Sequence, residues 1–248
     1  MRNIPVVILW AGCGRRISET IGGMHKSQIK LLGRTLMDRL LDNIYLAGAA
    51  EIIPVLGYRS EEMLDAIEDC VWRENGCIFE KITPVINKDY DKTNNLGSLL
   101  KAEEELKGRE FTVVNGDMVF DWRILKNILA VDGSAVGADL KSYPKQLDSP
   151  RLLIKDGRIL DIGRHMTIDN AQGYAIGIYK FGEDISRDYF ELGKKLLAEN
   201  PNAGYHDVLI GNLEKYKFIP SSVGDYLWMD IDEPDDIIKA EEFIKNIN

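Results

Sequence analysis

The stretch VVILWAGCGRRI (residues 6–17) decides the fold of this chain. Its first five residues form a continuous apolar run, which is typical of a strand buried on both faces of a parallel sheet. Gly12 and Gly14 interrupt the run, and Arg15 and Arg16 follow directly. In parallel sheets, ligands bind at the carboxyl ends of the strands. The stretch therefore predicts a phosphate site built from exposed backbone N–H groups and guanidinium groups.

The glycine loop alone does not identify the ligand. A Gly-x-Gly turn after a strand also occurs simply as a tight turn. Ile17 stands where a dinucleotide-binding fingerprint has its third glycine, and no Gly-Lys-Ser/Thr follows. The loop is therefore a poor dinucleotide fingerprint and no Walker P-loop.

The composition predicts a soluble globular protein with a local anion site. Of the 248 residues, 31 are Lys or Arg and 40 are Asp or Glu, which gives a formal net charge of −9. This acidity argues against a nucleic-acid partner bound to a broadly basic surface, but a local cluster of cations can still hold a small anion. The three cysteines form no CxxC pair, and the first apolar run is too short for a signal sequence or a membrane span. We therefore expect a cytoplasmic protein without a membrane partner.

Strand and helix patterns alternate over the first half of the chain. Apolar strand patterns at residues 4–10, 51–57, 77–87 and 111–117 alternate with helical patterns at 35–48, 60–72 and 95–106. This alternation predicts an α/β fold with a Rossmann-like, mostly parallel sheet flanked by helices.

The pattern changes after residue 117. Strand patterns at 133–141, 151–163, 173–181 and 216–232 surround a helical pattern at 187–200, and a helix is expected at 234–248. These segments predict a smaller β region inserted into the sheet. Without an internal repeat or a linker, we expect one domain over residues 1–248.

The residues after the glycine loop carry a resemblance to a known family. The stretch GCGRRISETIGGMHKSQIKLLGRTLMD (residues 12–38) resembles the pattern Gly-x-Gly-x-Arg, Pro-Lys and Gly-x-x-Leu of the nucleotidyltransferases that activate sugar phosphates and related phosphates. The matching residues are Gly12, Gly14, Arg16, Lys26, Gly33 and Leu36. The sequence departs from the pattern at His25, where the family usually has proline, and at Arg15, where a small residue is common.

Three further motifs follow in the family's order. YDKTNNLGSLLKAEEEL (residues 90–106) resembles the Asn-Asn-x-x-Ser-Leu segment of the cytidylyltransferase branch, which includes phosphocholine cytidylyltransferases. VVNGDMVF (113–120) and WMDIDEPDDIIKAEEF (228–243) resemble the family's Gly-Asp and terminal acidic motifs. The resemblance implies a GT-A-like nucleotidyltransferase fold, with a nucleotide-binding half at about 1–120. The half at about 121–248 would bind the acceptor and the metal.

The resemblance also implies roles for single residues. Arg16 would hold the β- and γ-phosphates of a nucleoside triphosphate, and Lys26 the α-phosphate and the attacking phosphate. The expected nucleotide-binding residues are Ala11, Gly12, Gly14, Arg15, Asn95 and Ser98. The Asn-Asn segment favours CTP, although Asn95 and Ser98 could equally serve as helix caps, and Arg15 could equally be a solvated surface charge.

Three aspartates are the candidate metal ligands. Asp117 follows an apolar run, where a strand should end, and Asp230 and Asp232 alternate around Ile231. On a strand, such alternation places both side chains on one face, and oxygen ligands of this kind suit Mg²⁺. The resemblance implies that the three share one Mg²⁺ at the α-phosphate. Each could also serve only as a turn or cap residue.

The implied reaction is nucleotidyl transfer. A phosphate oxygen of a phosphorylated small molecule attacks the α-phosphorus of the triphosphate in line, and pyrophosphate leaves. A phosphate monoester is already ionised near neutrality, so no side chain must act as a general base. The resemblance connects such a reaction with precursors of cell-surface polysaccharides or lipids, and it leaves a homo-oligomer open.

The second half is expected to select the acceptor through Arg151, Tyr174 and Asp207. A choline-type acceptor would need an aromatic cage. The aromatic residues available for one are Tyr143, Tyr174, Tyr205 and Trp228. Arg151, and Tyr174 in place of the glutamate that many relatives have, favour a neutral or anionic polyol or sugar phosphate as the acceptor. Choline-type and phosphonate-type acceptors stay open.

Two other functions remain open. An NAD(P)-dependent oxidoreductase would need an acidic residue or an arginine at the end of the second strand, where only Arg59 is available. A non-catalytic nucleotide-binding relative would lack Arg16, Lys26 or an acidic ligand, and all of these are present.

Overall fold

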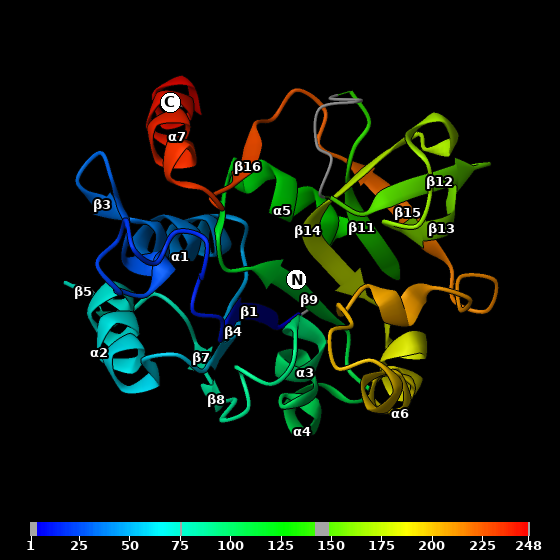
Figure 1. Ribbon diagram of the computed structural model, residues 1–248, viewed down its shortest axis with the longest axis horizontal. Coiled ribbons are helices and arrows are strands. Elements are labelled where there is room, and N and C mark those ends of the chain that lie inside the picture. Colours follow the sequence, from blue (N-terminus) through cyan, green and yellow to red (C-terminus); the bar gives the residue numbers. More distant parts are fainter. Residues whose placement is uncertain (1–3, 75, 142–148, 248) are drawn as a thin grey trace.

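The structure is a computed structural model that describes residues 4–74, 76–141 and 149–247. At its centre lies strand β1 (Val6–Trp10), which pairs in parallel with β4 (Glu51–Leu56) and β9 (Phe111–Asn115). Four of the five β1 residues are buried, which is why this run is apolar without alternation. The predicted strand before the glycine loop is therefore confirmed, and it lies in the middle of the sheet (Figure 1).

The second half of the chain extends the sheet with antiparallel strands. β14 (Gly173–Phe181) runs antiparallel to β9, and β12 (Arg151–Lys155) and β13 (Arg158–Gly163) follow at the edge. The remaining strands of this ten-stranded sheet are β7 (Lys81–Ile82), β8 (Val85–Ile86), β11 (Ser134–Asp139) and β15 (Phe218–Ser222). The predicted mostly parallel sheet with a smaller β region is confirmed.

Helices cover both faces of the sheet. The helices are α1 (Leu36–Leu46), α2 (Ser60–Val71), α3 (Asn95–Leu100), α4 (Glu103–Leu106), α5 (Trp122–Ala130), α6 (Glu183–Glu199) and α7 (Pro234–Ile247). Helices α3, α4 and α6 pack on one face, and α1, α2 and α5 on the other (Figure 1). Val7 belongs to the first core, whereas Val6 and Ile8 belong to the second, because side chains alternate along a strand.

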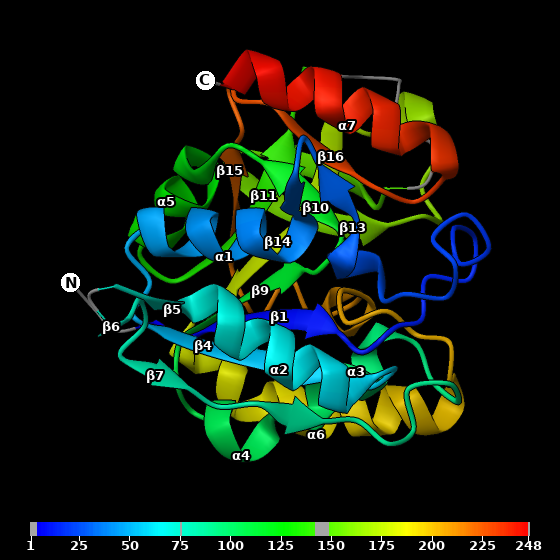
Figure 2. The ribbon, with the colours of Figure 1, turned by 90° about the vertical axis from the view of Figure 1, so that its left-hand side faces the viewer.

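A short ribbon and the last helix complete one end of the sheet. β10 (Met118–Phe120) pairs antiparallel with β16 (Trp228–Asp230), so that Met118 lies opposite Asp230. A third apolar cluster joins this ribbon to α7 and to the loop after β1, through residues such as Ile17, Val119 and Ile231. Figure 2 shows α7 lying across the end of the molecule that carries β16. The first family motif, in the loop after β1, and the last, in β16 and α7, therefore lie at the same edge of the sheet.

The smaller elements complete the description. The 3-10 helices are η1 (Lys26–Gln28), η2 (Ile168–Asn170) and η3 (Asp207–Leu209). The short strands are β2 (Lys30–Leu31), β3 (Arg34–Thr35), β5 (Trp72–Arg73) and β6 (Gly76–Cys77). Within the described ranges, no helix is both long and apolar enough to cross a bilayer.

Some boundaries differ from the sequence expectations. The single strand expected at 77–87 is divided into β7 and β8 on either side of Pro84, which cannot donate to a ladder. The helix expected at 95–106 is divided into α3 and α4, and α6 begins four residues earlier than the expected start at residue 187. β10 and α5 were not predicted, since each is short and its partners lie far away in the sequence.

Candidate active site

The carboxyl end of β1 opens onto three adjoining cavities. The loop cavity, of about 240 Å³, is lined by the glycine loop. The asparagine cavity, of about 210 Å³, is lined by the end of β1 and the start of α3. The large cavity, of about 930 Å³, is lined by residues of β14, β16 and α7. Asp117 lines all three, so the cavities form one continuous site around this carboxylate.

Most of the predicted site residues meet at these cavities. The loop cavity is lined by Gly12, Gly14, Arg15, Arg16 and Lys26, the asparagine cavity by Ala11, Gly12, Asn95 and Ser98, and the large cavity by Arg16, Asp117, Asp230 and Asp232. Residues that are more than 200 positions apart in the sequence therefore share one site. Their contacts with a nucleotide remain predictions.

Two glycines set the backbone around this site. Gly14 adopts a positive φ of 60°, and a Cβ there would lie 3.4 Å from Cβ of Lys26. Gly116 precedes Asp117, and a Cβ at that position would lie only 2.1 Å from Cδ1 of Trp10. The indole N–H of Trp10 also donates to the Gly116 carbonyl over 2.8 Å. The Gly-Asp motif thus places Asp117 directly against the end of β1.

His25 fixes the turn that presents Lys26. The N–H of Ser27 donates to Nδ1 of His25 over 3.2 Å, so the proton of the neutral ring lies on Nε2, which donates to the Trp10 carbonyl over 2.9 Å. Burial lowers the pKa of His25 to about 4, and the ring is therefore neutral at pH 7. His25 ties the lysine turn to the strand end, a role that the sequence did not reveal.

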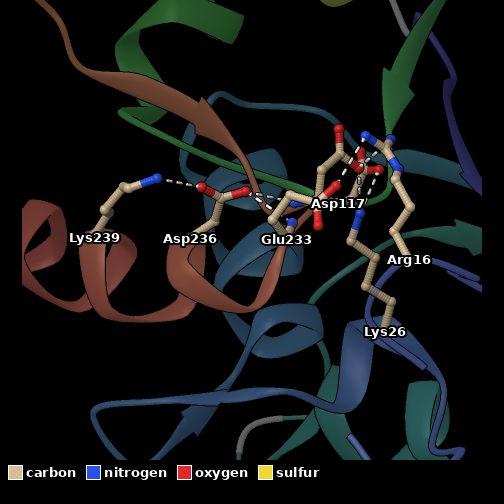
Figure 3. A network of polar contacts seen from close by, with 7 residues as sticks. Arg16, Lys26, Asp117, Glu233, Asp236 and Lys239 are labelled. Atoms are coloured by element: carbon tan, nitrogen blue, oxygen red, sulfur yellow. Dashed lines mark hydrogen bonds and ion pairs between the residues drawn. The ribbon is translucent and has the colours of Figure 1, made fainter. Parts of the chain in front are cut away.

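Lys26 lies between two carboxylates (Figure 3). Its Nζ is 3.0 Å from Oδ2 of Asp117 and 2.9 Å from Oδ1 of Asp232, and only 10% of its side chain is exposed. Burial lowers the pKa of Lys26, but Asp117 and Asp232 outweigh this effect and raise the pKa above its usual value. Lys26 is therefore a fixed positive charge in the loop cavity, beside the carboxylate that lines all three cavities.

Arg16, labelled in Figure 3, shares one of these carboxylates, Asp232, with Lys26. Its guanidinium group lies 3.0 Å from Oδ1 of Asp232 and 3.6 Å from Oε1 of Glu233. Asp236 accepts from the backbone N–H groups of Asp232 (3.1 Å) and Glu233 (2.9 Å), and Lys239 donates to its other oxygen. Asp236 at the start of α7 therefore holds the segment that carries Asp232 against the two cations.

Asp230 is the buried carboxylate of the group. Its Oδ1 has no hydrogen-bond partner among the described residues. Burial, followed by the charges of Asp117 and Asp232, raises the pKa of Asp230 well above its usual value. A divalent cation would relieve this repulsion and give the orphaned oxygen a partner, so Asp117 and Asp230 fit the one or two carboxylates that Mg²⁺ usually takes.

The three expected metal ligands have different neighbours in the structure. Among the described residues, no three His, Cys, Asp or Glu side chains gather as the ligands of one ion. Asp230 and Asp232 do line the same cavity, but Lys26 and Arg16 occupy the space beside Asp232. Asp232 therefore pairs with two cations and Asp117 with Lys26 alone, whereas Asp230 forms no ion pair among the described residues. Which of the three carboxylates hold a metal remains a prediction.

The residues predicted to bind the nucleotide also form hydrogen bonds that stabilise the fold. Asn94, rather than Asn95, is the N-cap of α3, and its side chain accepts from the backbone N–H of Asn95. Oδ1 of Asn95 accepts from the backbone N–H of Tyr205 over 3.0 Å, and Oγ of Ser98 accepts from Asn87 over 3.0 Å. Asn95 thus connects the two halves of the chain while it lines the asparagine cavity.

The expected acceptor residues lie elsewhere. Arg151, Tyr174 and Asp207 do not line the large cavity. Tyr174 is fully buried within the sheet, opposite both Arg151 and Asp139, and Arg151 donates to the carbonyl of Arg164. Asp207 faces the buried ring of His206 over 3.2 Å. The structure thus places none of the three on this cavity, and their contacts with an acceptor remain a prediction.

The aromatic residues available for a choline cage are separated in the part of the chain that the structure describes. Tyr205 lines the large cavity, but Tyr174 is buried in the sheet, and the indole N–H of Trp228 donates to Asp139. Tyr143 lies outside the described residues.

Sequence reasoning missed several residues that line the large cavity. Ala175, Gly177 and Tyr179 form one face of β14, and His206 and Arg164 lie beside them. The spacing of two along β14 is the signal that could have shown these residues to share a face. Gly177 has a φ of 78°, and a Cβ there would lie 2.5 Å from Nδ2 of Asn115.

The glycine loop, the two cations and the carboxylates at the edge of a mostly parallel sheet are features expected of a protein that binds nucleoside phosphates. Residues 6–146 match the MobA-like NTP transferase domain. The chain therefore belongs to this family of nucleotidyltransferases, as the resemblance implied.

The chain is also similar to individual nucleotidyltransferases and to a solved structure of one. The chain is 28% identical, over 96% of its length, to the bifunctional IPC transferase and DIPP synthase of Aquifex aeolicus (strain VF5), and it spans about half (51%) of that protein. It is 23% identical to the CTP:phosphoglutamine cytidylyltransferase of Campylobacter jejuni, covering 93% of this chain and 96% of the relative. The inositol-1-phosphate CTP transferase from T. maritima has the same fold, with a TM-score of 0.82, 18% identity and coverage of 99% and 96% of the two chains.

Proposed function

We propose that this chain is a Mg²⁺-dependent cytidylyltransferase. It transfers CMP from CTP to the phosphate of a small phosphorylated acceptor and releases pyrophosphate. The half at about 1–120 binds the nucleotide, and the half at about 121–248 binds the acceptor and the metal. The cytosol, where CTP is available, is the proposed compartment.

One observation carries this proposal. Nζ of Lys26, which lines the loop cavity, lies within 3.0 Å of Asp232 and of Asp117, the carboxylate that lines all three cavities. A cation held there is placed to contact both a nucleotide phosphate and an acceptor phosphate. This supports a reaction in which two polyanions must be brought together.

The chain's own residues would act through charge and position. The acceptor phosphate oxygen attacks the α-phosphorus, the bond to the β-phosphate oxygen breaks, and pyrophosphate leaves with the bonding electrons. Lys26 stabilises the charge that develops on the α-phosphoryl oxygens. Arg16 turns from Asp232 and Glu233 toward the leaving pyrophosphate. Gly12 leaves the backbone open toward the loop cavity, since nothing lies within 4 Å of a Cβ placed there.

Asp117 and Asp230 would hold the Mg²⁺ ion. Bound there, it would neutralise charge on the nucleotide phosphates. Asp232 would keep Lys26 and Arg16 aligned between the reactants. This division is supported by the unpartnered Oδ1 of Asp230 and by the ion pairs of Asp232.

The choice of CTP rests on the Asn-Asn segment and on the relatives. The Campylobacter protein and the T. maritima structure are both named for CTP. The phosphorylated acceptor follows from the same names, which differ in the acceptor itself.

Pyrophosphate release tests the proposal. The four nucleoside triphosphates are each combined with glycerol 3-phosphate, glucose 1-phosphate, inositol 1-phosphate and phosphocholine, with and without Mg²⁺. We expect release only with Mg²⁺, with CTP preferred, and with at least one of these acceptors. Absence of release with every pair would leave a nucleotide-binding protein without transferase activity.

The oxidoreductase alternative finds no support in the site. Its candidate residue, Arg59, pairs with Glu62 over 2.6 Å and lines none of the three cavities.

A further inference from the structure

Tyr205 connects two asparagines that lie between the large cavity and the asparagine cavity. Its backbone N–H donates to Oδ1 of Asn95 over 3.0 Å, and its hydroxyl donates to Oδ1 of Asn115 over 3.1 Å. Asn95 begins α3, and Asn115 ends β9. One tyrosine therefore holds two amide groups that come from different elements of the fold.

These hydrogen bonds decide which end of each amide is left for a ligand. A backbone N–H can only donate, and burial raises the pKa of Tyr205, so its hydroxyl keeps a proton to donate as well. Because both oxygens accept from Tyr205, both amide nitrogens point away from it. Nδ2 of Asn95 and Nδ2 of Asn115 have no hydrogen-bond partner within the described ranges, and neither nitrogen is enclosed by the protein. Each amide therefore keeps two N–H groups for a ligand.

Both asparagines lie where the two cavities adjoin. The described residues that line the large cavity and the asparagine cavity alike are Asn94, Asn95, Asn115 and Asp117. Asn115 also lies against Gly177, since a Cβ placed on Gly177 would be 2.5 Å from Nδ2 of Asn115. Gly177 itself lines the large cavity. The lack of a side chain at Gly177 therefore leaves this nitrogen open to that cavity.

The segment that carries Tyr205 is fastened to the start of α3. The backbone N–H of Asn94 donates to the Pro201 carbonyl, and its side chain donates to the Asn202 carbonyl, each over 3.0 Å. Tyr189 donates to the Tyr205 carbonyl over 2.7 Å, and Tyr205 is only 2% exposed. Tyr205 is therefore a fixed support, and the fold itself orients the two amides before a ligand binds.

The asparagine cavity offers neutral donors where the loop cavity offers cations. Arg16 and Lys26 line the loop cavity, and neither lines the asparagine cavity. Among the described residues that line the asparagine cavity, Asp117 alone carries a full charge, and it forms an ion pair with Lys26. Negative charge from Asp230 and Asp117 also reaches Tyr205. A phosphate oxygen on this side of Asp117 therefore depends on neutral N–H and O–H donors.

We propose that Tyr205 is a positioning residue, which holds the amide nitrogens of Asn95 and Asn115 where they donate to an oxygen of the reacting phosphoryl group. In nucleotidyl transfer the new bond joins the nucleotide to the acceptor phosphate, so the reacting phosphorus lies where their cavities adjoin. Fixed N–H donors aimed at its oxygens stabilise the charge that develops there. This inference rests on the proposed function, because it takes the nucleotide to bind in the asparagine cavity and the acceptor in the large cavity.

Four variants test this inference: Tyr205→Phe, Asn115→Leu, the double variant of these two, and Tyr216→Phe. Tyr205→Phe removes the hydroxyl that holds Asn115 and keeps the backbone N–H that holds Asn95. Asn115→Leu removes the amide and keeps a side chain of similar shape. Tyr216 is the matched control, because it is also buried (3% exposed) and its hydroxyl bonds Asp188, but it lines none of the three cavities. Steady-state pyrophosphate release is measured with CTP, Mg²⁺ and each of the four acceptors, and thermal unfolding reports on the fold.

The expected rates distinguish a positioning role from a structural one. Asn115→Leu should lower kcat about 10²-fold, the usual cost of one transition-state donor. Tyr205→Phe should lower kcat about tenfold, because the amide remains but loses its fixed orientation. The double variant should be no slower than Asn115→Leu alone, since Tyr205 acts on this oxygen through that amide. KM for CTP should change less than about twofold in each, because the donor acts mainly in the transition state. Tyr216→Phe should lower Tm and leave kcat unchanged.

A binding measurement tests the amide contact without turnover. The side-chain N–H signals of Asn115 in a ¹⁵N-labelled protein are assigned by their loss in Asn115→Leu. CTP with Mg²⁺, added without an acceptor, should shift these signals in the wild type. The shift should be smaller in Tyr205→Phe at the same saturation, because the freed amide rotates away from the phosphate for part of the time. Tyr216→Phe should give the wild-type shift.

The inference and the proposed function fail in different ways. Turnover by the wild type, with losses in kcat that multiply in the double variant, would overturn the inference and leave the transferase intact. Asn115 signals that do not move with CTP would also overturn the inference. A CTP-dependent shift in a wild type that releases no pyrophosphate with any acceptor would support the amide contact and refute the transferase. If Tyr205→Phe does not fold, the rates of Asn115→Leu and the signals of the wild type still decide, since a normal kcat in Asn115→Leu would overturn the inference.

Discussion

Replacement of Lys26 by methionine should separate its structural role from its catalytic role. The substitution keeps the length of the side chain and removes the charge between Asp117 and Asp232. Removal of one partner from a buried ion pair costs about 3–5 kcal/mol, whereas an exposed pair is worth about 0–1 kcal/mol. Nζ of Lys26 is buried, but its two carboxylate partners are 33% and 34% exposed. We therefore expect Lys26→Met to lower the free energy of unfolding by about 2–3 kcal/mol, between these limits.

Thermal unfolding and pyrophosphate release measure the two effects. At about 2–4 °C per kcal/mol for a chain of this length, Tm should fall by about 4–12 °C. Turnover should fall by about 10²–10³, the usual cost of one transition-state donor. The exposed Lys30, four residues away, provides the matched control, because Lys30→Met should change the free energy of unfolding by less than about 0.5 kcal/mol.

A double variant makes this prediction sharper. Lys26→Met combined with Asp117→Asn removes the carboxylate that the single variant leaves unpaired, since Asp232 keeps its ion pair with Arg16. The double variant should regain a large part of the lost Tm, but it should not regain turnover. Near-normal turnover in Lys26→Met would refute the catalytic role. An unchanged Tm in the single variant, or no recovery of Tm in the double variant, would refute the claim that the charge of Lys26 stabilises the fold by pairing with the carboxylates.

Three further predictions follow from the same site. Because the pKa of His25 is about 4 when folded and 6.5 when unfolded, unfolding takes up a proton between these values. The wild type should therefore lose up to about 3 kcal/mol relative to His25→Asn as the pH falls from 6.5 to 4 (2.5 units at 1.36 kcal/mol each), and equal urea midpoints at every pH would contradict this. Asp230→Asn should unfold at the wild-type Tm or above it without metal, since it removes a buried like charge. It should not show the roughly 3–5 °C rise that Mg²⁺ at ten times its Kd gives the wild type, and an equal rise in both would exclude Asp230 as a ligand. In steady-state pyrophosphate release, Arg16→Ala should lower turnover about 10²-fold. Arg15→Ala should lower it less than tenfold, because Arg15 forms no ion pair among the described residues, and the reverse order would reassign the two arginines.

The sequence predicts the phosphate side of the site better than the acceptor side, for a physical reason. Gly12, Arg16 and Lys26 lie on one continuous loop, so their spacing alone places them together. Asp117 follows a strand that pairs with β1, and the rule that parallel strands end at one edge brings it to the loop. Local patterns and one topological rule are sufficient for these residues.

The large cavity depends on pairings that no local pattern specifies. β14 follows β12 and β13 in the chain, yet it lies between β12 and β9 in the sheet. This insertion decides that Ala175, Gly177 and Tyr179 line the large cavity and that Tyr174 does not, although both tyrosines are buried. For the same reason the ion pair between Arg16 and Asp232, whose residues are far apart in the sequence, follows only from the fold.

His25 shows that a departure from a family pattern can conserve the underlying geometry. Proline, the family's usual residue at this position, fixes φ near −65°. His25 has a φ of −68° and a ψ of 139°, a conformation that proline also favours. Its ring constrains the turn through hydrogen bonds to Trp10 and Ser27, where proline would constrain it through a covalent ring. The position of Lys26 is therefore maintained by different chemistry, and this chemistry depends on a neutral imidazole. The substitution exchanges a constraint that is independent of pH for one that is lost when the ring takes up a proton.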